Sequence, residues 1–189
     1  VDEALRQTAP WIADGLIEGV AVNLSSMDLA DGDLPEYVAQ RLRARDVPSR
    51  GLVLEVTEHT LMRDLKAARA TMHRLRGLGV QLSIDDFGTG HSSLAQLRSL
   101  PVDEIKIDRS FVADLGDGSG DAVIVRSAIE IGHNMGLKVI AEGVEGQASL
   151  AILETLQCDM VQGYLFSRPL PPDAFVDWCT RYQGHRVEA

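Results

Sequence analysis

Two adjacent carboxylates, Asp85 and Asp86, end an apolar stretch that reads LSI. Like charges at the end of a buried strand repel each other and lose hydration, so the pair calls for a favourable partner such as a cation. Further acidic and amide side chains stand near the ends of other apolar stretches, at Asn23, Glu55 and Glu142. Together these five residues offer four carboxylates and one amide oxygen.

Carboxylate and amide oxygens are the ligands that hard cations such as Mg²⁺ and Mn²⁺ prefer. We therefore expect a site for two divalent cations, in which Asp85 bridges both. Two ions about 3.5–4 Å apart clamp the attacking and leaving oxygens of a phosphoryl transfer. No histidine ends any of these stretches, which argues against zinc. Each residue taken singly could instead be a turn or capping residue, but their joint occurrence favours a metal site.

Lys106 lies inside the apolar stretch EIKID, where a lysine either snorkels or is held near anionic groups. Two roles stay open for it. It could form a structural ion pair with a nearby aspartate, or it could orient an attacking water and stabilise developing negative charge. Gly88 and Gly90 after the aspartate pair allow backbone conformations that other residues resist, as in a tight connection or a mobile loop.

Six apolar stretches predict six strands, which we place at 19–25, 51–58, 79–86, 102–108, 136–145 and 159–166. Helical periodicity between and after them predicts helices at 34–47, 61–75, 121–135, 146–157 and 172–182. This alternation is typical of an α/β protein with parallel strands. Because functional side chains end nearly every strand, and a barrel gathers all strand ends at one mouth, we expect a TIM-type βα barrel rather than an open sheet.

The bulk composition indicates one soluble globular domain of 189 residues. A net charge of −10 disfavours binding to polymeric nucleic acid. We expect no membrane insertion, because no apolar run approaches about 18 residues. The start VDEALRQTAPW lacks the basic and apolar regions of a signal peptide, and two cysteines form no disulfide framework. A cytoplasmic location is the expectation, although the parent protein could be tethered to a membrane.

The chain resembles the EAL domain, the cyclic di-GMP phosphodiesterase module of bacteria. The resemblance rests on AVNLS, LEVTE, IDDFGTGHSSL, LPVDEIKIDRSFV, VIAEGVE and CDMVQGYLFSRPL, which occur in the family's order. It implies a βα barrel that hydrolyses cyclic di-GMP to linear pGpG with two divalent cations, Mg²⁺ or Mn²⁺. It also implies a homodimer, with the DDFGTG loop near the interface.

The resemblance assigns roles to individual positions. The metal ligands would be Asn23, Glu55, Asp85, Asp86 and Glu142. Lys106 would position the attacking water, and Glu58 would anchor the DDFGTG loop. Gln162, Glu145 and Asp108 would lie near the substrate.

Two departures from the family pattern stand out, the first minor and the second serious. His91 replaces an aromatic residue, usually tyrosine. The segment Glu3–Arg6 spells the family's name motif, but it stands only twenty residues before Asn23 and reads as a helix start. We therefore expect residues 1–189 to be a partial EAL domain with about six of the eight barrel strands.

A barrel that lacks two strands exposes two sheet edges, and one metal site would lose a carboxylate. We expect this chain alone to bind its metals weakly and turn over slowly. Two alternatives remain open. One is a catalytically inactive module that binds cyclic di-GMP or another protein, and the other is an unrelated Mg²⁺-dependent barrel enzyme.

Overall fold

A computed structural model gives the structure of the protein and describes residues 1–90, 94–116 and 120–182, with only the backbone for Met62 and Arg63. Six parallel strands form one sheet in the order in which they occur along the chain. They are β1 Val20–Asn23, β2 Leu52–Thr57, β3 Gln81–Phe87, β4 Glu104–Ile107, β5 Lys138–Glu142 and β6 Met160–Gln162. All six predicted strands are confirmed; each is shorter than predicted, β5 and β6 most of all, and β3 ends at Phe87, one residue later than predicted.

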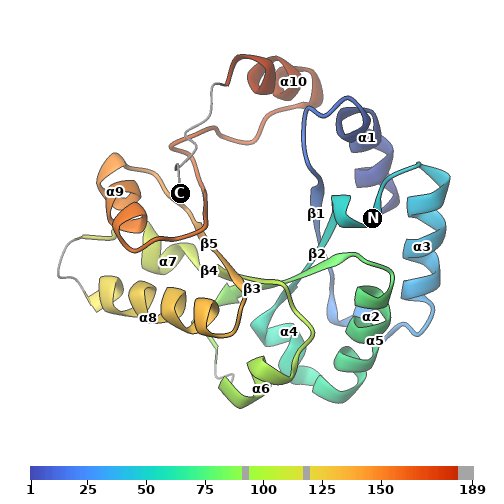
Figure 1. Ribbon diagram of the computed structural model, residues 1–189, viewed down its shortest axis with the longest axis horizontal. Helices are drawn as coiled ribbons and strands as arrows, with labels where there is room; N and C mark the ends of the chain where they lie inside the picture. The colour runs from blue at the N-terminus through green and yellow to red at the C-terminus, as the bar shows by residue number, and fades with distance from the viewer. Residues whose placement is uncertain (91–93, 117–119, 183–189) are drawn as a thin grey trace.

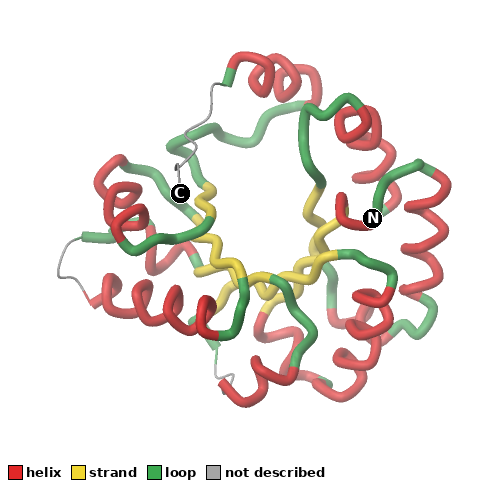
Figure 2. The backbone as a smooth tube through the Cα atoms, viewed as in Figure 1, coloured by secondary structure: helices red, strands yellow, loops and turns green. Residues whose placement is uncertain are grey.

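Helices surround the sheet on its outer side (Figure 1). They are α1 Asp2–Ala13, α2 Ser26–Ala30, α3 Leu34–Ala44, α4 Glu58–Arg63, α5 Leu65–Gly77, α6 Leu94–Ser99, α7 Arg109–Val112, α8 Gly120–Asn134, α9 Gln147–Thr155 and α10 Pro172–Arg181. A 3₁₀ turn, η1 Ser49–Gly51, precedes β2. The tube view in Figure 2 shows the strands as an arc inside this ring of helices. The prediction of an α/β, TIM-type barrel with about six strands is confirmed.

The hydrophobic core lies between the outer face of the arc and the helices. Leu54 and Val56 of β2 are fully buried, as are Met72 and Leu75 of α5. Burying an aliphatic side chain of this kind stabilises the fold by about 1.5–3 kcal/mol. The helices are thereby fixed against the strands, and the carboxyl ends of the strands are held at one rim.

The inner face of the arc is buried in the middle and exposed at both edges. The register places Glu55 beside Ser83 and Ser83 beside Glu104, and all three are buried. At the edges Asn23 and Gln162 are exposed, and Met160 is 47% exposed. The difference arises because β1 and β6 each have one neighbouring strand in the sheet.

Between the two edges of the sheet, the helices α1 and α10 contact each other. The ring centroids of Trp11 in α1 and Phe175 in α10 lie 5.2 Å apart, and Figure 1 shows these two helices side by side. A cavity of about 860 Å³ is lined by β6, the segment that follows it and α10, including Trp178. α10 itself contains no buried residue.

Two sequence expectations about helices can be compared with the structure. The helix expected over 61–75 is wrong as a single element, because it is divided at Asp64 between α4 and α5. Asp64 has φ −149°, and its side chain accepts a hydrogen bond of 3.0 Å from Ala67 N, which starts a new helix. The expectation that Glu3 begins a helix is confirmed, and its carboxylate pairs with Arg6 at 2.9 Å.

Within the described residues, none of the helices combines the length and the apolar character that crossing a bilayer requires.

Gly163 tests how closely the ends of β5 and β6 pack. A Cβ at this position would overlap the backbone nitrogen and oxygen of Val144. We expect Gly163→Ala to lower the free energy of unfolding by about 1–3 kcal/mol or more, since neither backbone can rotate away. Denaturant unfolding measures the change. Gly32→Ala is the control, because a Cβ there has no atom within 4 Å; equal effects of both changes would contradict the packing argument.

Candidate functional site

Lys106 lies at the centre of the candidate site, near the carboxyl end of β4, and is only 5% exposed. Its Nζ is 2.6 Å from Glu142 Oε1, 2.7 Å from Glu55 Oε1 and 3.6 Å from Asp85 Oδ1. These partners come from three other strands, because parallel strands in consecutive order present their carboxyl ends at one rim. One buried cation therefore connects β2, β3, β4 and β5.

The charge of Lys106 is maintained by its partners. Burial by itself would lower the pKa of the lysine, but the hydrogen bonds to Glu142 and Glu55 outweigh burial and raise it above its ordinary value. Burial also raises the pKa of Glu142, against the opposing effect of Lys106. The ammonium is therefore protonated at neutral pH and offsets part of the negative charge of the cluster.

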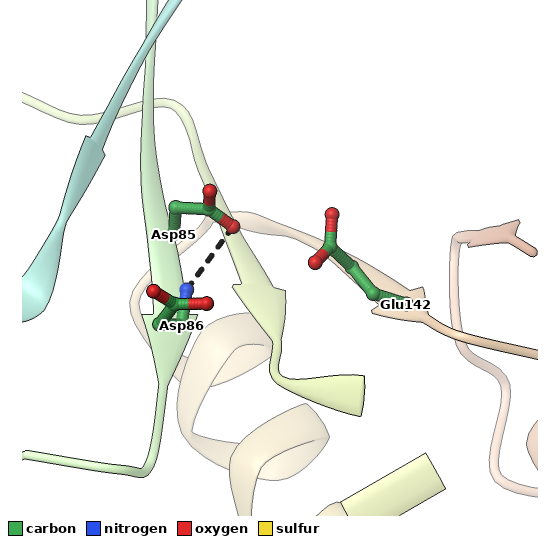
Figure 3. A group of neighbouring side chains, drawn as sticks. All are labelled: Asp85, Asp86 and Glu142. Atoms are coloured by element: carbon green, nitrogen blue, oxygen red, sulfur yellow. Dashed lines mark hydrogen bonds between the residues drawn. The ribbon is translucent and has the colours of Figure 1, made fainter. Parts of the chain in front are cut away.

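Asp85, Asp86 and Glu142 each offer a carboxylate oxygen, and these oxygens lie within 4.8 Å of one another. Figure 3 shows the two aspartates on β3 facing Glu142 on β5, with the Asp86 amide donating to Asp85 Oδ1 at 3.1 Å. An all-oxygen set of this size fits a hard divalent cation. The residues present are thus suited to Mg²⁺ or Mn²⁺.

A local irregularity in β3 allows both aspartates to reach the same space. In a regular strand, neighbouring side chains point to opposite faces of the sheet. Asp86 instead has φ +56°, and the pairing of β3 with β4 changes register between Ile84 and Phe87. Positive φ is uncommon for a residue with a side chain. This conformation redirects the backbone so that consecutive carboxylates share one site.

Electrostatic repulsion accompanies this arrangement. The pKa of Asp86 is raised by burial first, and then by the negative charges of Asp85 and Asp108. Raised carboxyl pKa values in a cleft often mark functional sites. A divalent cation placed among these oxygens would reverse the effect, which accounts physically for the adjacent acidic pair in the sequence.

Glu58 holds the turn that follows the aspartates. It is 4% exposed, and its Oε2 accepts hydrogen bonds of 3.3 Å from the amides of both Gly88 and Gly90. A Cβ on Gly90 would lie 2.7 Å from the Glu58 carboxyl carbon, so a larger residue would not fit without movement. The anchoring role that the resemblance implies for Glu58 stays a prediction, and these hydrogen bonds are the contacts it would use.

The other predicted site residues stand at or beyond the ends of neighbouring strands. Asn23 pairs with Glu55 in the β1–β2 register, and Gln162 pairs with Glu142 in the β5–β6 register. Both are exposed, as is Glu145. Asn23 and Gln162 end the two edge strands, and Glu145 lies beyond the end of β5. All three side chains are accessible at the predicted rim. His91 lies outside the described residues.

Asp108 has a structural contact of its own. It precedes α7 and accepts a hydrogen bond of 3.0 Å from Ser110 N. Burial would raise the pKa of Asp108, but the hydrogen bonds from Ser110 hold it below its ordinary value. Its carboxylate also lies within hydrogen-bonding reach of Asp86. Asp108 thus caps α7 and also lies beside Asp86.

Sequence reasoning missed Glu104, which is 6% exposed on the inner face of β4. Burial raises the pKa of its carboxyl group. The signal was present in the sequence, because Glu104 precedes Lys106 by two residues and a strand directs such residues to the same face. Glu104 therefore adds a further acidic group on the same face of β4 as Lys106.

Comparisons with known proteins agree with this geometry. The family model described as EAL domain matches residues 1–169. The bifunctional diguanylate cyclase/cyclic di-GMP phosphodiesterase MucR of Pseudomonas aeruginosa is 42% identical over 174 residues. That match covers 92% of this chain but 25% of MucR, so the chain spans about a quarter of that relative's length.

Two solved structures share the fold. The phosphodiesterase of PaMucR in complex with c-di-GMP has a TM-score of 0.86 and 43% identity, covering 92% of this chain and 76% of that one. Klebsiella pneumoniae BlrP1, in a complex with manganese and cyclic di-GMP, has a TM-score of 0.81 and 30% identity, covering 89% of this chain and 42% of that one.

Removing the positive charge of the buried Lys106 should strongly destabilise the fold. We expect Lys106→Met to lower the free energy of unfolding by about 3–5 kcal/mol at pH 7, because the buried Glu55 and the partly buried Glu142 would lose their counter-charge. The raised pKa means that the contribution of Lys106 is complete below its unfolded value of 10.5 and is lost only at more alkaline pH.

Denaturant unfolding at pH 7 and pH 5 measures this effect. The deficit of the variant should shrink at pH 5, because burial raises the pKa of Glu142 and its protonation would reduce the repulsion in the cluster. Lys66→Met on the exposed side of α5 is the matched control. A loss for Lys106→Met no larger than that of the control would refute the electrostatic account.

Proposed function

Because the chain belongs to the EAL domain family, we propose that it is a metal-dependent phosphodiesterase that hydrolyses cyclic di-GMP to linear pGpG in bacterial second-messenger signalling. One observation carries the proposal: a buried lysine and converging carboxylates lie together at the carboxyl-terminal rim of a parallel sheet. Catalytic groups of βα barrels lie at this end. We further propose that the chain acts in the cytoplasm.

The proposed cofactors are two divalent cations, Mg²⁺ or Mn²⁺. Asp85, Asp86 and Glu142 would provide the central ligands, with Glu55 and Asn23 as neighbouring oxygen donors. When bound, such ions polarise phosphoryl oxygens and make water a better nucleophile. The all-oxygen donor set and the raised pKa of Asp86 support this assignment.

The protein's own groups would position and stabilise the reacting atoms. Lys106 is held in place by Glu55 and Glu142, so its ammonium would need little reorganisation to orient a water or to meet charge developing on the phosphate. Glu58 would keep the turn after Asp86 in place through the amides of Gly88 and Gly90. Both residues would thus act by holding groups in place before the reaction.

Substrate contacts are proposed for Gln162, Glu145 and Asp108, which lie at or just beyond the ends of β6, β5 and β4. The exposure of Gln162 and Glu145 leaves both accessible to a ligand at the rim. A net charge of −10 favours a small metal-bound dinucleotide over polymeric nucleic acid. A homodimer also remains a prediction, and light scattering would detect it as twice the 20.5 kDa chain mass.

A second function, cyclic di-GMP binding without hydrolysis, is favoured by one specific observation. Asn23 and the inner residues of both edge strands are exposed, so ligands on the β1 side are less enclosed than those on β3 and β5. A less enclosed site binds cations more weakly. Such a chain would bind the dinucleotide and leave it intact.

Hydrolysis with matched variants tests the proposal. We expect slow release of pGpG from cyclic di-GMP with Mn²⁺ or Mg²⁺, abolished by chelation. Glu142→Gln should reduce turnover by about a hundredfold or more, comparable to losing one preorganised electrostatic group. Chromatography of the products measures the rate, and calorimetry measures dinucleotide and Mn²⁺ binding separately.

Glu130→Gln provides the control, since Glu130 is exposed on α8 and the change removes the same charge. Cyclic di-GMP binding without cleavage would support the non-hydrolytic module. Neither binding nor cleavage, or cleavage unaffected by Glu142→Gln, would contradict the proposed site.

A further inference from the structure

The ring of Phe111 in α7 fills the space beside Gly88, in the turn directly after β3. A Cβ on Gly88 would lie 3.1 Å from Cε2 of Phe111, and 3.7 and 3.8 Å from Cζ and Cδ2. Such an approach is tighter than ordinary van der Waals contact, so the ring occupies the space that a side chain would need. Gly88 also has φ +101°, a conformation that glycine adopts readily.

Glu58 also contacts this turn. That carboxylate, at the start of α4, accepts hydrogen bonds from Gly88 and Gly90, and the aromatic ring of Phe111 comes from the element after β4. The turn is thus contacted by groups from the elements that follow β2 and β4, the two strands that flank β3. One group acts through hydrogen bonds and the other through steric contact.

The turn is connected directly to the unusual conformation of Asp86. The Asp86 carbonyl accepts hydrogen bonds from Thr89, at 3.3 Å from the amide and 2.9 Å from the hydroxyl. A non-glycine residue with positive φ persists only where its surroundings hold it, since such a conformation costs about 1–3 kcal/mol. Displacing Gly88 would therefore release the constraint that directs the Asp86 carboxylate toward Asp85 and Glu142.

We propose that Phe111 is a positioning residue for the candidate metal site. By packing against Gly88 it fixes the turn after β3, and so sets the direction of the Asp86 carboxylate. The proposal rests on the proposed function for its consequence, which is a tighter cation site. Its structural part, control of the turn by the ring, stands independently of metal binding.

Val112 offers a matched comparison on the same short helix. It is fully buried in the core, whereas Phe111 is partly buried and reaches the turn. Truncating either residue removes apolar packing and should destabilise the fold. Only the loss of Phe111 should change the turn.

The experiment compares Phe111→Ala and Phe111→Leu with Val112→Ala in the full chain. We expect Phe111→Ala to weaken Mn²⁺ binding by about tenfold or more in calorimetry, the effect expected when a supporting group of a metal ligand is lost. Amide hydrogen exchange at Gly88 and Gly90 should accelerate by about tenfold or more, because the turn opens more often. Val112→Ala should leave both quantities within about twofold once its loss of stability is accounted for.

The milder Phe111→Leu keeps the test decisive if Phe111→Ala fails to fold, with the same direction expected for both readouts. Unchanged exchange and unchanged Mn²⁺ affinity in a folded Phe111 variant would overturn the proposal, as would equal effects from Val112→Ala. If the wild type binds no Mn²⁺ but the turn still exchanges faster without the ring, the proposed function fails while the positioning role of Phe111 stands.

Discussion

A buried ammonium among carboxylates from neighbouring strands is the interaction on which the rest of the site depends. An isolated charge is costly to bury by several kcal/mol, so Lys106 requires Glu55 and Glu142 beside it. Glu142 in turn requires positive charge nearby, because burial and the negative charges of Asp85 and Glu55 raise its pKa. Neither partner would be stable in place alone. One lysine therefore neutralises only part of the negative charge of the site.

The sheet topology makes this balance possible. With six parallel strands in chain order, every carboxyl end lies at one rim, and residues distant in sequence become neighbours. The outer helices anchor the strands by apolar burial and leave the rim free for polar groups. One local irregularity, at Asp86, adds a second carboxylate from the same strand. Strained backbone of this kind is common where function depends on precise placement.

Much of the fold could be predicted because its signals are local. Strands buried on both faces read as continuous apolar stretches, and the glycines that follow them mark connections. The division between α4 and α5 escaped prediction because both helices present apolar residues to one core, so the periodicity continues across Asp64. The unequal exposure of Asn23 and Glu55 also could not be predicted, since both end apolar stretches and only the number of neighbouring strands distinguishes them.

The sequence by itself determined which chemical groups stand at the strand ends, and therefore that hard cations and phosphate were the chemistry to expect. Tertiary structure decided which oxygen atoms meet. The direction of Asp86 depends on its positive φ, and the contacts of Lys106 depend on the packing that brings side chains from three other strands to it. Residue types are encoded one at a time, but distances between side chains arise only when the packed sheet fixes every strand relative to the others.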